Sequence, residues 1–182
     1  MPGWVWHTRA MAGVTIREAT AADDRAIGEL LVRAFVEKYA TKMPEVQVTE
    51  RRIAELRDVA NKRAAAKVWV AELDGRVVGT VALWLKGSRG SESWIPTACD
   101  LRHLAVDTSV RGQGTSAALL DAAEQTARDA GATAVVLHVR RGAVGVRRLY
   151  EARGYRRDES GDLDLRPEVF LEAFVLPLSA QQ

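Results

Sequence analysis

The run from Cys99 to Val139 constrains the fold more than any other part of the chain. It predicts a strand over Cys99–Val106, an alanine-rich helix over Thr115–Ala130 and a nearly continuous apolar strand over Ala132–Val139. An unbroken apolar strand is typical of one that is buried on both faces, and two strands joined through a helix favour a parallel crossover. We therefore expect a sheet with at least one parallel pair.

The flanking segments predict further strands and helices. Strands are expected at 14–18, 68–73, 77–85, 155–157 and 169–176, and helices at about 27–35, 49–66 and 144–153. Asp74-Gly75 separates two apolar runs, and this pair favours a type I′ hairpin turn because both central positions of that turn need positive φ. The order of elements is that of an α/β (α+β) protein with a mixed sheet.

Length and composition fit one globular domain. The chain has 182 residues, of which 47% are hydrophobic and 27% charged, so a sizeable core can be buried. We expect a single domain over residues 14–178. Residues 1–13 contain Trp4 and Trp6 but no basic start followed by a long apolar run, so they are interpreted as a flexible N-terminal extension rather than a signal peptide.

Several classes of protein are disfavoured. Cys99 is the one cysteine, which excludes an intrachain disulfide and a cysteine-based metal cluster and fits a reducing, cytoplasmic compartment. The longest apolar stretch, Val77–Leu85, is far shorter than the ~20 residues that cross a bilayer, so no membrane segment is expected. A net charge of +2 is too small to indicate nucleic-acid binding. No metal is expected.

The segment Arg111-Gly112-Gln113-Gly114-Thr115-Ser116 stands between the Cys99–Val106 strand and the following helix. Glycines let the backbone approach a bulky ligand, and a helix start offers unpaired N–H groups and partial positive charge. No acid occurs from Ser109 to Leu120, and Arg111 adds a cation. The turn therefore predicts a phosphate site, although a ligand-free glycine connection has the same pattern.

Other phosphate motifs do not match. The chain contains no G-x-x-x-x-G-K-[ST], and Ala117 stands where the third glycine of G-x-G-x-x-G would fall. A dinucleotide site also expects its motif next to the first strand, with an acid after the next strand, whereas three strands precede the strand that leads into this turn. A nucleotide-binding protein of the dinucleotide type is therefore disfavoured.

With a second motif downstream, the chain resembles the GNAT superfamily, the Gcn5-related N-acetyltransferases, from Val14 to about Leu176. Arg111 to Ser116 is similar to the family motif [QR]-x-x-G-x-[GA], and Leu149 to Tyr155 is similar to L-Y-x-x-x-G-[FY]. The resemblance implies a GNAT-type mixed, splayed sheet of about six to seven strands flanked by about four helices.

The resemblance also implies where acetyl-CoA binds. Pantetheine would pair with the backbone of Leu104, Ala105 and Val106, and a main-chain N–H there would polarise the thioester carbonyl. The pyrophosphate would bind amides of Arg111, Gly112, Gln113, Gly114, Thr115 and Ser116. The arginine-rich segment 140–157 has seven arginines against one acid, and it is interpreted either as a holder of the remaining phosphate or as a solvated surface.

Tyr150 carries over from the second motif as the general acid that protonates the departing thiolate, since a phenol roughly matches a thiol leaving group in pKa. The alternative is a tyrosine that only packs in the core. Asp100 and His103 are candidates for the general base, and strand alternation puts Asp100 on the face with Arg102 and His103 on the other. Either residue can instead have a structural role.

Two departures from the family pattern keep a second function open. Ser116 replaces the last small residue of the first motif, and Ala143 stands where many members carry an asparagine. The first hypothesis is an enzyme that moves an acetyl group from acetyl-CoA to an amine of a small molecule or protein through a ternary complex. The alternative is a non-catalytic acyl-CoA-binding sensor or interaction module. The resemblance also allows a homodimer.

Overall fold

The computed structural model describes residues 13–37 and 48–179. The predicted extension over 1–13 lies outside these residues except for Gly13, so it stays a prediction. Chain contacts divide the protein into two compact units, the first within residues 1–82 and 103–123 and the second within 83–102 and 124–182. We describe each unit by itself, and the single domain expected over 14–178 also stays a prediction.

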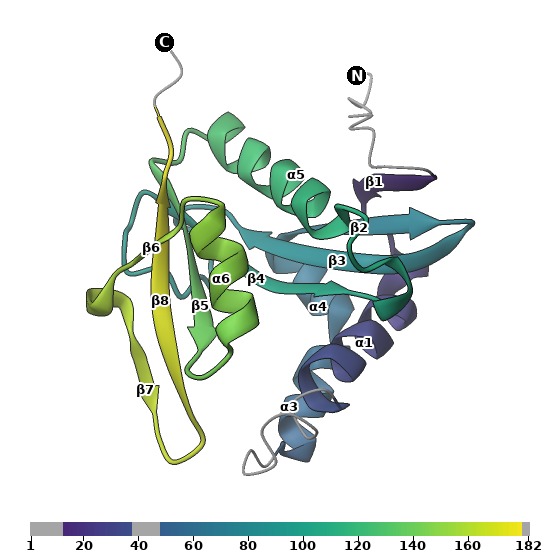
Figure 1. The fold of residues 1–182 in the computed structure, drawn as a ribbon, viewed down its shortest axis with the longest axis horizontal. Coiled ribbons are helices and arrows are strands. Elements are labelled where there is room, and N and C mark those ends of the chain that lie inside the picture. The colour runs from purple at the N-terminus through teal and green to yellow at the C-terminus, as the bar shows by residue number, and fades with distance from the viewer. Residues whose placement is uncertain (1–12, 38–47, 180–182) are drawn as a thin grey trace. The chain divides into compact units, whose positions relative to one another are not determined.

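The strands and helices occur along the chain in the order that the sequence predicts (Figure 1). The strands are β1 (Val14–Glu18), β2 (Lys67–Leu73), β3 (Arg76–Trp84), β4 (Ala98–Val106), β5 (Ala134–Arg140), β6 (Arg156–Arg157), β7 (Leu163–Leu165) and β8 (Val169–Pro177). The α-helices are α1 (Asp24–Val32), α3 (Glu50–Arg57), α4 (Val59–Ala65), α5 (Thr115–Asp129) and α6 (Val144–Ala152). Short turns of helix are η1 (Ala21–Asp23), η2 (Arg33–Glu37), η3 (Thr108–Val110) and η4 (Glu159–Gly161). The strands pair in the order β1-β2-β3-β4-β5-β8-β6, and β7 pairs with β8. This mixed sheet with helices confirms the predicted fold class.

The first unit is built around the predicted hairpin. β1 pairs antiparallel with β2, from Val14 opposite Leu73 to Glu18 opposite Trp69. The turn that joins β2 to β3 has positive φ at both Asp74 (50°) and Gly75 (74°), as a type I′ turn requires. The hairpin prediction is confirmed.

Gly79 lets the start of α5 lie close to β3. A Cβ at this glycine would be 3.0 Å from Leu119 Cδ1, 3.2 Å from Ala71 Cβ and 3.3 Å from Thr115 Cγ2. Real side chains rarely tolerate such distances, so a larger residue would push the helix away from the strand. Figure 1 shows α1 on the opposite side of these strands.

The predicted helix over 49–66 is wrong in one respect, because it is broken at Asp58 into α3 and α4. Asp58 has φ −77° and ψ 65°, outside the helical region, and its side chain accepts a hydrogen bond from the Asn61 backbone N–H. An aspartate can cap a new helix in this way. The apolar periodicity continues across the break, and for that reason the sequence pattern did not show it.

The second unit is centred on β5. β4 pairs with it in parallel from Ala98 opposite Ala134 to Leu101 opposite Leu137, which confirms the predicted parallel pair. β8 pairs antiparallel along the whole of β5 and also pairs with β6 and β7. The sequence analysis missed β7, because three residues are too short to show a period of two.

Each unit has its own buried apolar residues. The first unit buries Ile27, Leu31, Leu56, Val59, Val70 and Leu119, and the second buries Leu101, Val135, Val136, Leu137, Tyr155 and Phe174. Among the helices that the structure describes, none is both long enough and apolar enough to cross a bilayer.

Candidate active site

The predicted phosphate turn is an exposed loop between η3 and α5. Its glycines have left-handed conformations, with φ of 73° at Gly112 and 76° at Gly114. Arg111, Gln113 and both glycines are exposed, and a Cβ built on either glycine would meet nothing within 4 Å. The backbone of this turn is therefore open to a ligand that comes close to its amides.

The start of α5 provides polar groups that are not used within the helix. Its first turn contains no acid, as the sequence predicts. Thr115 is 2% exposed, and its Oγ1 has no hydrogen-bond partner among the described residues. The nearest preceding acid, Asp107, accepts from the Ser109 N–H at 2.9 Å and lies 3.6 Å from Arg33, so it is already paired. The first N–H groups of α5 can donate hydrogen bonds to an anion at this point.

β4 has an irregularity at His103 that the sequence did not indicate. His103 is in the left-handed region with φ of 59°, which is uncommon for a residue with a side chain. The register with β5 ends two residues earlier, at Leu101. Beyond His103, Leu104 and Val106 are half-buried and Ala105 is buried. The backbone of this second half of β4 therefore departs from the simple alternation that the sequence analysis assumed.

His103 itself is half-buried. Its imidazole lies edge-on to the ring of Phe35, with centroids 6.1 Å apart. The contact with the Phe35 ring suits a packing role. Its assignment as a general base therefore stays a prediction.

Asp100 is fully buried and paired with an arginine. Its Oδ2 accepts from Arg102 and, at 2.8 Å, from the Glu92 backbone N–H. The Arg102 guanidinium also lies 4.3 Å from the centroid of the Trp84 ring. The pairing with Arg102 agrees with the predicted shared face and supports the structural role for Asp100. Its Oδ1 has no partner among the described residues, so its role as a general base is still untested.

Tyr150 lies near the end of α6 and is 5% exposed. Its ring contacts Tyr155 in a T-shaped arrangement, with centroids 5.3 Å apart. Tyr155 in turn donates a hydrogen bond to Glu124 of α5. The sequence analysis missed Glu124, although an acid four residues after Leu120 and three before Ala127, both buried, stands on the apolar stripe of its helix.

The predicted site residues fall into the two units. His103, Leu104, Ala105, Val106 and the turn from Arg111 to Ser116 belong to the first unit, and Asp100 and Tyr150 belong to the second. Within the first unit, the strand residues and the turn are joined directly through Asp107 and η3. Among the described residues, no group of His, Cys, Asp and Glu side chains is arranged to hold a metal ion.

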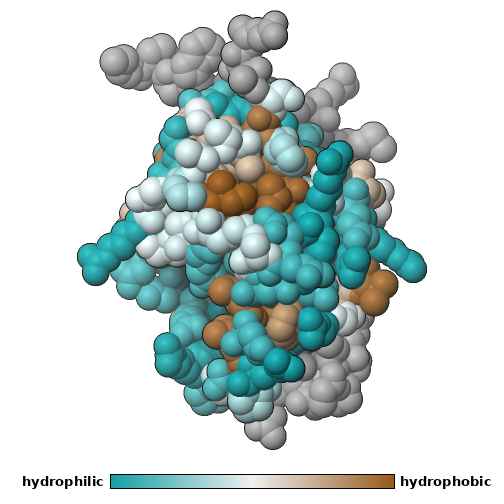
Figure 2. All heavy atoms as spheres, turned by 90° about the vertical axis from the view of Figure 1, so that its left-hand side faces the viewer, coloured by the Kyte–Doolittle hydropathy of each residue, from teal (hydrophilic) through white to brown (hydrophobic). Residues whose placement is uncertain are grey.

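Most arginines of segment 140–157 take part in the surface of the second unit. Arg141 pairs with Glu172, Arg147 with Glu151, Arg153 with Glu124 and Arg157 with Asp162. Figure 2 views the side that carries β6, β7 and β8 and shows hydrophilic side chains around small, separate hydrophobic groups. The side chains of Arg141 and Arg147 are about half exposed, which fits a solvated surface, whereas those of Arg153 and Arg157 are about four-fifths buried beside their partners.

Cys99 is fully buried in β4, and burial raises the pKa of its thiol. A thiol that is shielded from water and harder to ionise is a poor nucleophile. This environment favours a packing role for Cys99 over covalent chemistry.

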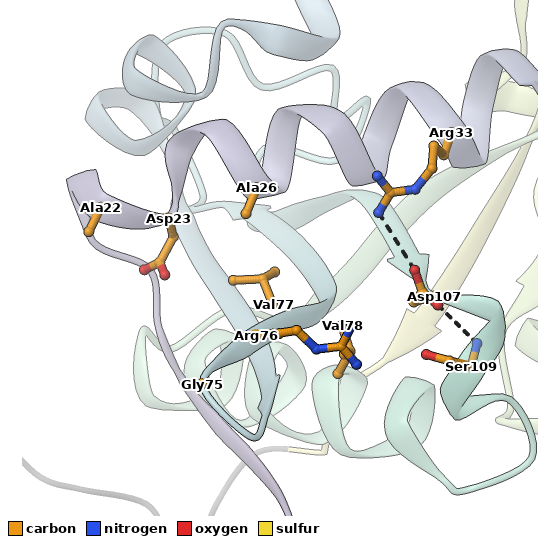
Figure 3. Close-up of a pocket in the computed structure, with 10 residues that line it drawn as sticks. All are labelled: Ala22, Asp23, Ala26, Arg33, Gly75, Arg76, Val77, Val78, Asp107 and Ser109. Atoms are coloured by element: carbon orange, nitrogen blue, oxygen red, sulfur yellow. Dashed lines mark hydrogen bonds and ion pairs between the residues drawn. The ribbon is translucent and has the colours of Figure 1, made fainter.

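A cavity of about 410 Å³ lies in the first unit between α1, the β2–β3 turn and η3 (Figure 3). Its acids are paired, Asp107 with Arg33 and Asp23 with Arg17 at 2.8 Å. Hydrogen bonding from the Arg17 guanidinium holds the pKa of the Asp23 carboxyl well below its ordinary value. None of the predicted site residues lines this cavity.

Comparisons with known proteins agree on one family. A family model described as acetyltransferase (GNAT) family matches residues 25–155. N-acetyltransferase 8B of Rattus norvegicus is 40% identical over 90 residues, which are 49% of this chain and 39% of that protein. N-acetyltransferase 8 of the same species is 35% identical over 114 residues, which are 60% of this chain and 50% of that protein. The chain thus matches half or less of the length of these curated relatives.

Solved structures share the fold. A GNAT acetyltransferase from Staphylococcus aureus Mu50 has a TM-score of 0.71 at 16% identity and covers 92% of this chain and 100% of its own. The ribosomal-protein-S18-alanine N-acetyltransferase of Escherichia coli has a TM-score of 0.65 at 17% identity, over 93% and 96% of the two chains. A GNAT family acetyltransferase from Elizabethkingia anophelis, solved with acetyl-CoA bound, has a TM-score of 0.62 at 14% identity, over 92% and 100%. At these identities the likeness concerns the fold alone.

Proposed function

The chain belongs to the acetyltransferase (GNAT) family, and from this premise we propose that it moves an acetyl group from acetyl-CoA to a primary amine. The amine attacks the thioester directly while both substrates are bound, so no acyl-enzyme forms. The acceptor is an amine of a small molecule or a protein. Such an attack needs no metal, because the amine is itself the nucleophile.

The open turn before α5 is the observation that carries this proposal. Gly112 and Gly114 have free space where a Cβ would be, and all of residues 111–114 are exposed. These features suit a pyrophosphate on the amides of Arg111, Gly112, Gln113, Gly114, Thr115 and Ser116. The buried Thr115 Oγ1, which has no partner among the described residues, supports a ligand at the same place.

The second half of β4 would hold the pantetheine arm. Leu104 and Val106 are half-buried, and the register with β5 ends before them, at Leu101. Backbone groups of Leu104, Ala105 and Val106 would pair with the amides of the arm. A main-chain N–H in this stretch would stabilise the negative charge that develops on the thioester oxygen during attack.

Tyr150 is proposed as the general acid. As the amine forms the C–N bond, the electrons of the C–S bond move to sulfur, and the Tyr150 hydroxyl supplies the proton that sulfur takes up. The proton that the amine loses goes to a base or to water. Asp100 and His103 remain candidates for this base, and His103 is favoured because Asp100 is fully buried and paired with Arg102.

The wider setting of the enzyme is also proposed. We propose one domain over residues 14–178 with residues 1–13 as an extension, in the cytoplasm, and without nucleic acid or membrane as a partner. The single cysteine and the small net charge support this setting. Homodimers are part of the same proposal and follow from the family resemblance alone.

A non-catalytic acyl-CoA-binding module is the alternative, and Ala143 is the observation that favours it. Ala143 occupies the N-cap position of α6, and no side chain caps the helix there. An asparagine at this position would supply a polar contact that alanine lacks. The alternative predicts binding of acetyl-CoA without release of CoA in the presence of amines.

The deciding experiment combines titration and turnover. Calorimetric titration with acetyl-CoA is expected to give a dissociation constant of about micromolar order, and amine-dependent release of CoA identifies the acceptor. Tyr150→Phe is expected to lower kcat by about 10² to 10³ while acetyl-CoA binding stays within about twofold. Tight binding without turnover over a broad amine panel would favour the alternative. A folded protein that does not bind acetyl-CoA would overturn both functions.

A further inference from the structure

A buried ion pair lies next to Tyr155 in the second unit. The Glu124 side chain is 5% exposed and accepts from Arg153 Nε at 2.7 Å and from Arg153 Nη2 at 3.0 Å. The Tyr155 hydroxyl donates to the same carboxylate, to Oε1, at 3.1 Å. Three hydrogen bonds from two residues thus hold one carboxylate, which is a rigid arrangement in a buried place.

The chain turn after α6 brings Tyr155 against Tyr150. Gly154 has φ of 102°, a conformation that side chains rarely adopt, and it allows the backbone to reverse. The Tyr155 N–H then donates to the Tyr150 carbonyl at 3.0 Å, and the two rings meet at an interplanar angle of 66°. The position of the Tyr150 ring therefore depends on where Tyr155 is held.

The Tyr155 hydroxyl is buried and already paired. Tyr155 is 2% exposed and its hydroxyl is committed to Glu124. Burial and then the negative charge of Glu124 raise the pKa of Tyr155 well above its ordinary value. A hydroxyl that is buried and bonded to a carboxylate does not give its proton to an outside group, so Tyr155 supports its neighbour instead of competing with it.

We propose that Glu124 is a positioning residue for Tyr150: it holds Tyr155 through the hydroxyl, and Tyr155 holds the ring of Tyr150 in the place from which it protonates sulfur. This inference rests on the proposed function for its effect on turnover. The positional part stands on the contacts alone. Arg153 keeps the Glu124 carboxylate oriented, so that one of its oxygens always faces Tyr155.

A double-mutant cycle tests the effect on turnover. Glu124→Gln keeps the shape of the side chain but removes its charge, and we expect kcat to fall about tenfold with KM for acetyl-CoA within about twofold. In a Tyr150→Phe background the same change is expected to alter kcat by less than about twofold, because Glu124 acts through Tyr150. Equal effects in both backgrounds would mean a general structural role and would overturn the proposal.

A matched control separates this effect from loss of charge on the helix. Asp129→Asn changes an exposed acid of α5 to its amide, and within the part of the chain that the structure describes Asp129 accepts a hydrogen bond from Gln125 of the same helix. We expect it to leave kcat unchanged. Tyr155→Phe removes the hydroxyl but keeps the ring, and it is expected to reproduce most of the effect of Glu124→Gln.

A second measurement does not depend on activity. The chain has three tyrosines, Tyr39, Tyr150 and Tyr155, so protein with ¹³C-labelled tyrosine gives three ring signals that single Tyr→Phe variants assign. Glu124→Gln is expected to shift the signals of Tyr155 and Tyr150, and Asp129→Asn to shift neither. An unchanged Tyr150 signal in folded Glu124→Gln protein would overturn the positioning role. A shifted signal in a protein without turnover would leave that role standing while the proposed function fails.

Discussion

The start of α5 and its second half differ in how their polar groups are exposed and paired. At the start, the turn 111–114 is exposed, its glycines have open space around them, and the Thr115 hydroxyl has no partner among the described residues. In the second half, Glu124 is buried and accepts three hydrogen bonds. Polar groups left without partners suit a ligand, whereas a fully paired group fixes other side chains in place.

The strongest way to break this comparison is to remove the buried carboxylate. Glu124→Ala removes the buried carboxylate that accepts from both Arg153 and Tyr155, and we expect the free energy of unfolding to fall by about 3 to 5 kcal/mol. Urea unfolding of purified protein measures this. Asp129→Ala on the exposed side of the same helix is the control, with an expected change of less than about 0.5 kcal/mol. Equal losses of unfolding free energy in the two variants would show that the buried ion pair stabilises the protein no more than the exposed acid does.

Filling the open turn tests the other side of the comparison. Ser116→Trp places a large ring at the start of α5, and we expect acetyl-CoA to bind at least about 100-fold more weakly, or about 2.7 kcal/mol, with little change in stability. Calorimetric titration measures the affinity. Thr108→Trp adds the same bulk at an exposed residue of η3 and should leave binding unchanged. If Ser116→Trp binds acetyl-CoA with wild-type affinity, the phosphate site is not at the start of α5.

Lys62 sharpens the comparison, because it is buried like Glu124 but its Nζ has no hydrogen-bond partner among the described residues. Burial lowers the pKa of this amine from 10.5 to about 8. The unfolded chain binds more protons than the folded one between these values, so this lysine makes stability rise with pH across that window. Below about pH 8 the charged amine costs stability on the order of 3 kcal/mol.

Lys62→Met is therefore expected to stabilise the protein at pH 7 and to remove this contribution to the pH dependence of the free energy of unfolding. The difference between wild type and variant is the quantity to measure, because the raised pKa of Cys99 makes stability fall as pH rises above 9 in both proteins. Lys67→Met at an exposed lysine is the control. If the difference between Lys62→Met and wild type does not change from pH 7 to pH 10, the amine is not buried in solution.

The smallest expected effect concerns the exposed cation of the turn. Arg111→Ala should weaken acetyl-CoA binding by about three- to fivefold at low salt, and the difference should shrink at about 0.5 M salt because exposed charges are screened. Titration at both salt concentrations measures it. Arg25→Ala, at a side chain that is 90% exposed on α1, should have no effect. A salt-independent loss would indicate that Arg111 shapes the turn rather than attracting phosphate.

Local patterns predicted the regular elements well. The Asp74-Gly75 turn has the two positive φ angles that its sequence requires, and the parallel pair of β4 and β5 follows from a buried apolar strand after a helix. The break at Asp58 and the strand β7 were missed. Both depend on a capping contact or on pairing with β8, and neither leaves a periodic signal in a short stretch.

The catalytic and cofactor roles of the predicted residues are still proposals. The structure shows the contacts that some of these residues make. Asp100 was placed on the face of Arg102 by alternation, and that pairing is present. The left-handed His103 could not be predicted, because a histidine gives no signal for positive φ and the conformation is imposed by the surrounding fold.

The sequence by itself determined the order of elements, the hairpin, the two motifs and the family to which the chain belongs, because turns, periodicity and short motifs are local properties. Only the tertiary structure decided that Glu124 meets Arg153 and Tyr155, that Tyr155 packs against Tyr150, and that Asp100 is fully buried. These contacts join residues up to 31 positions apart. Packing selects such partners, and it acts only once the helices and strands have come together.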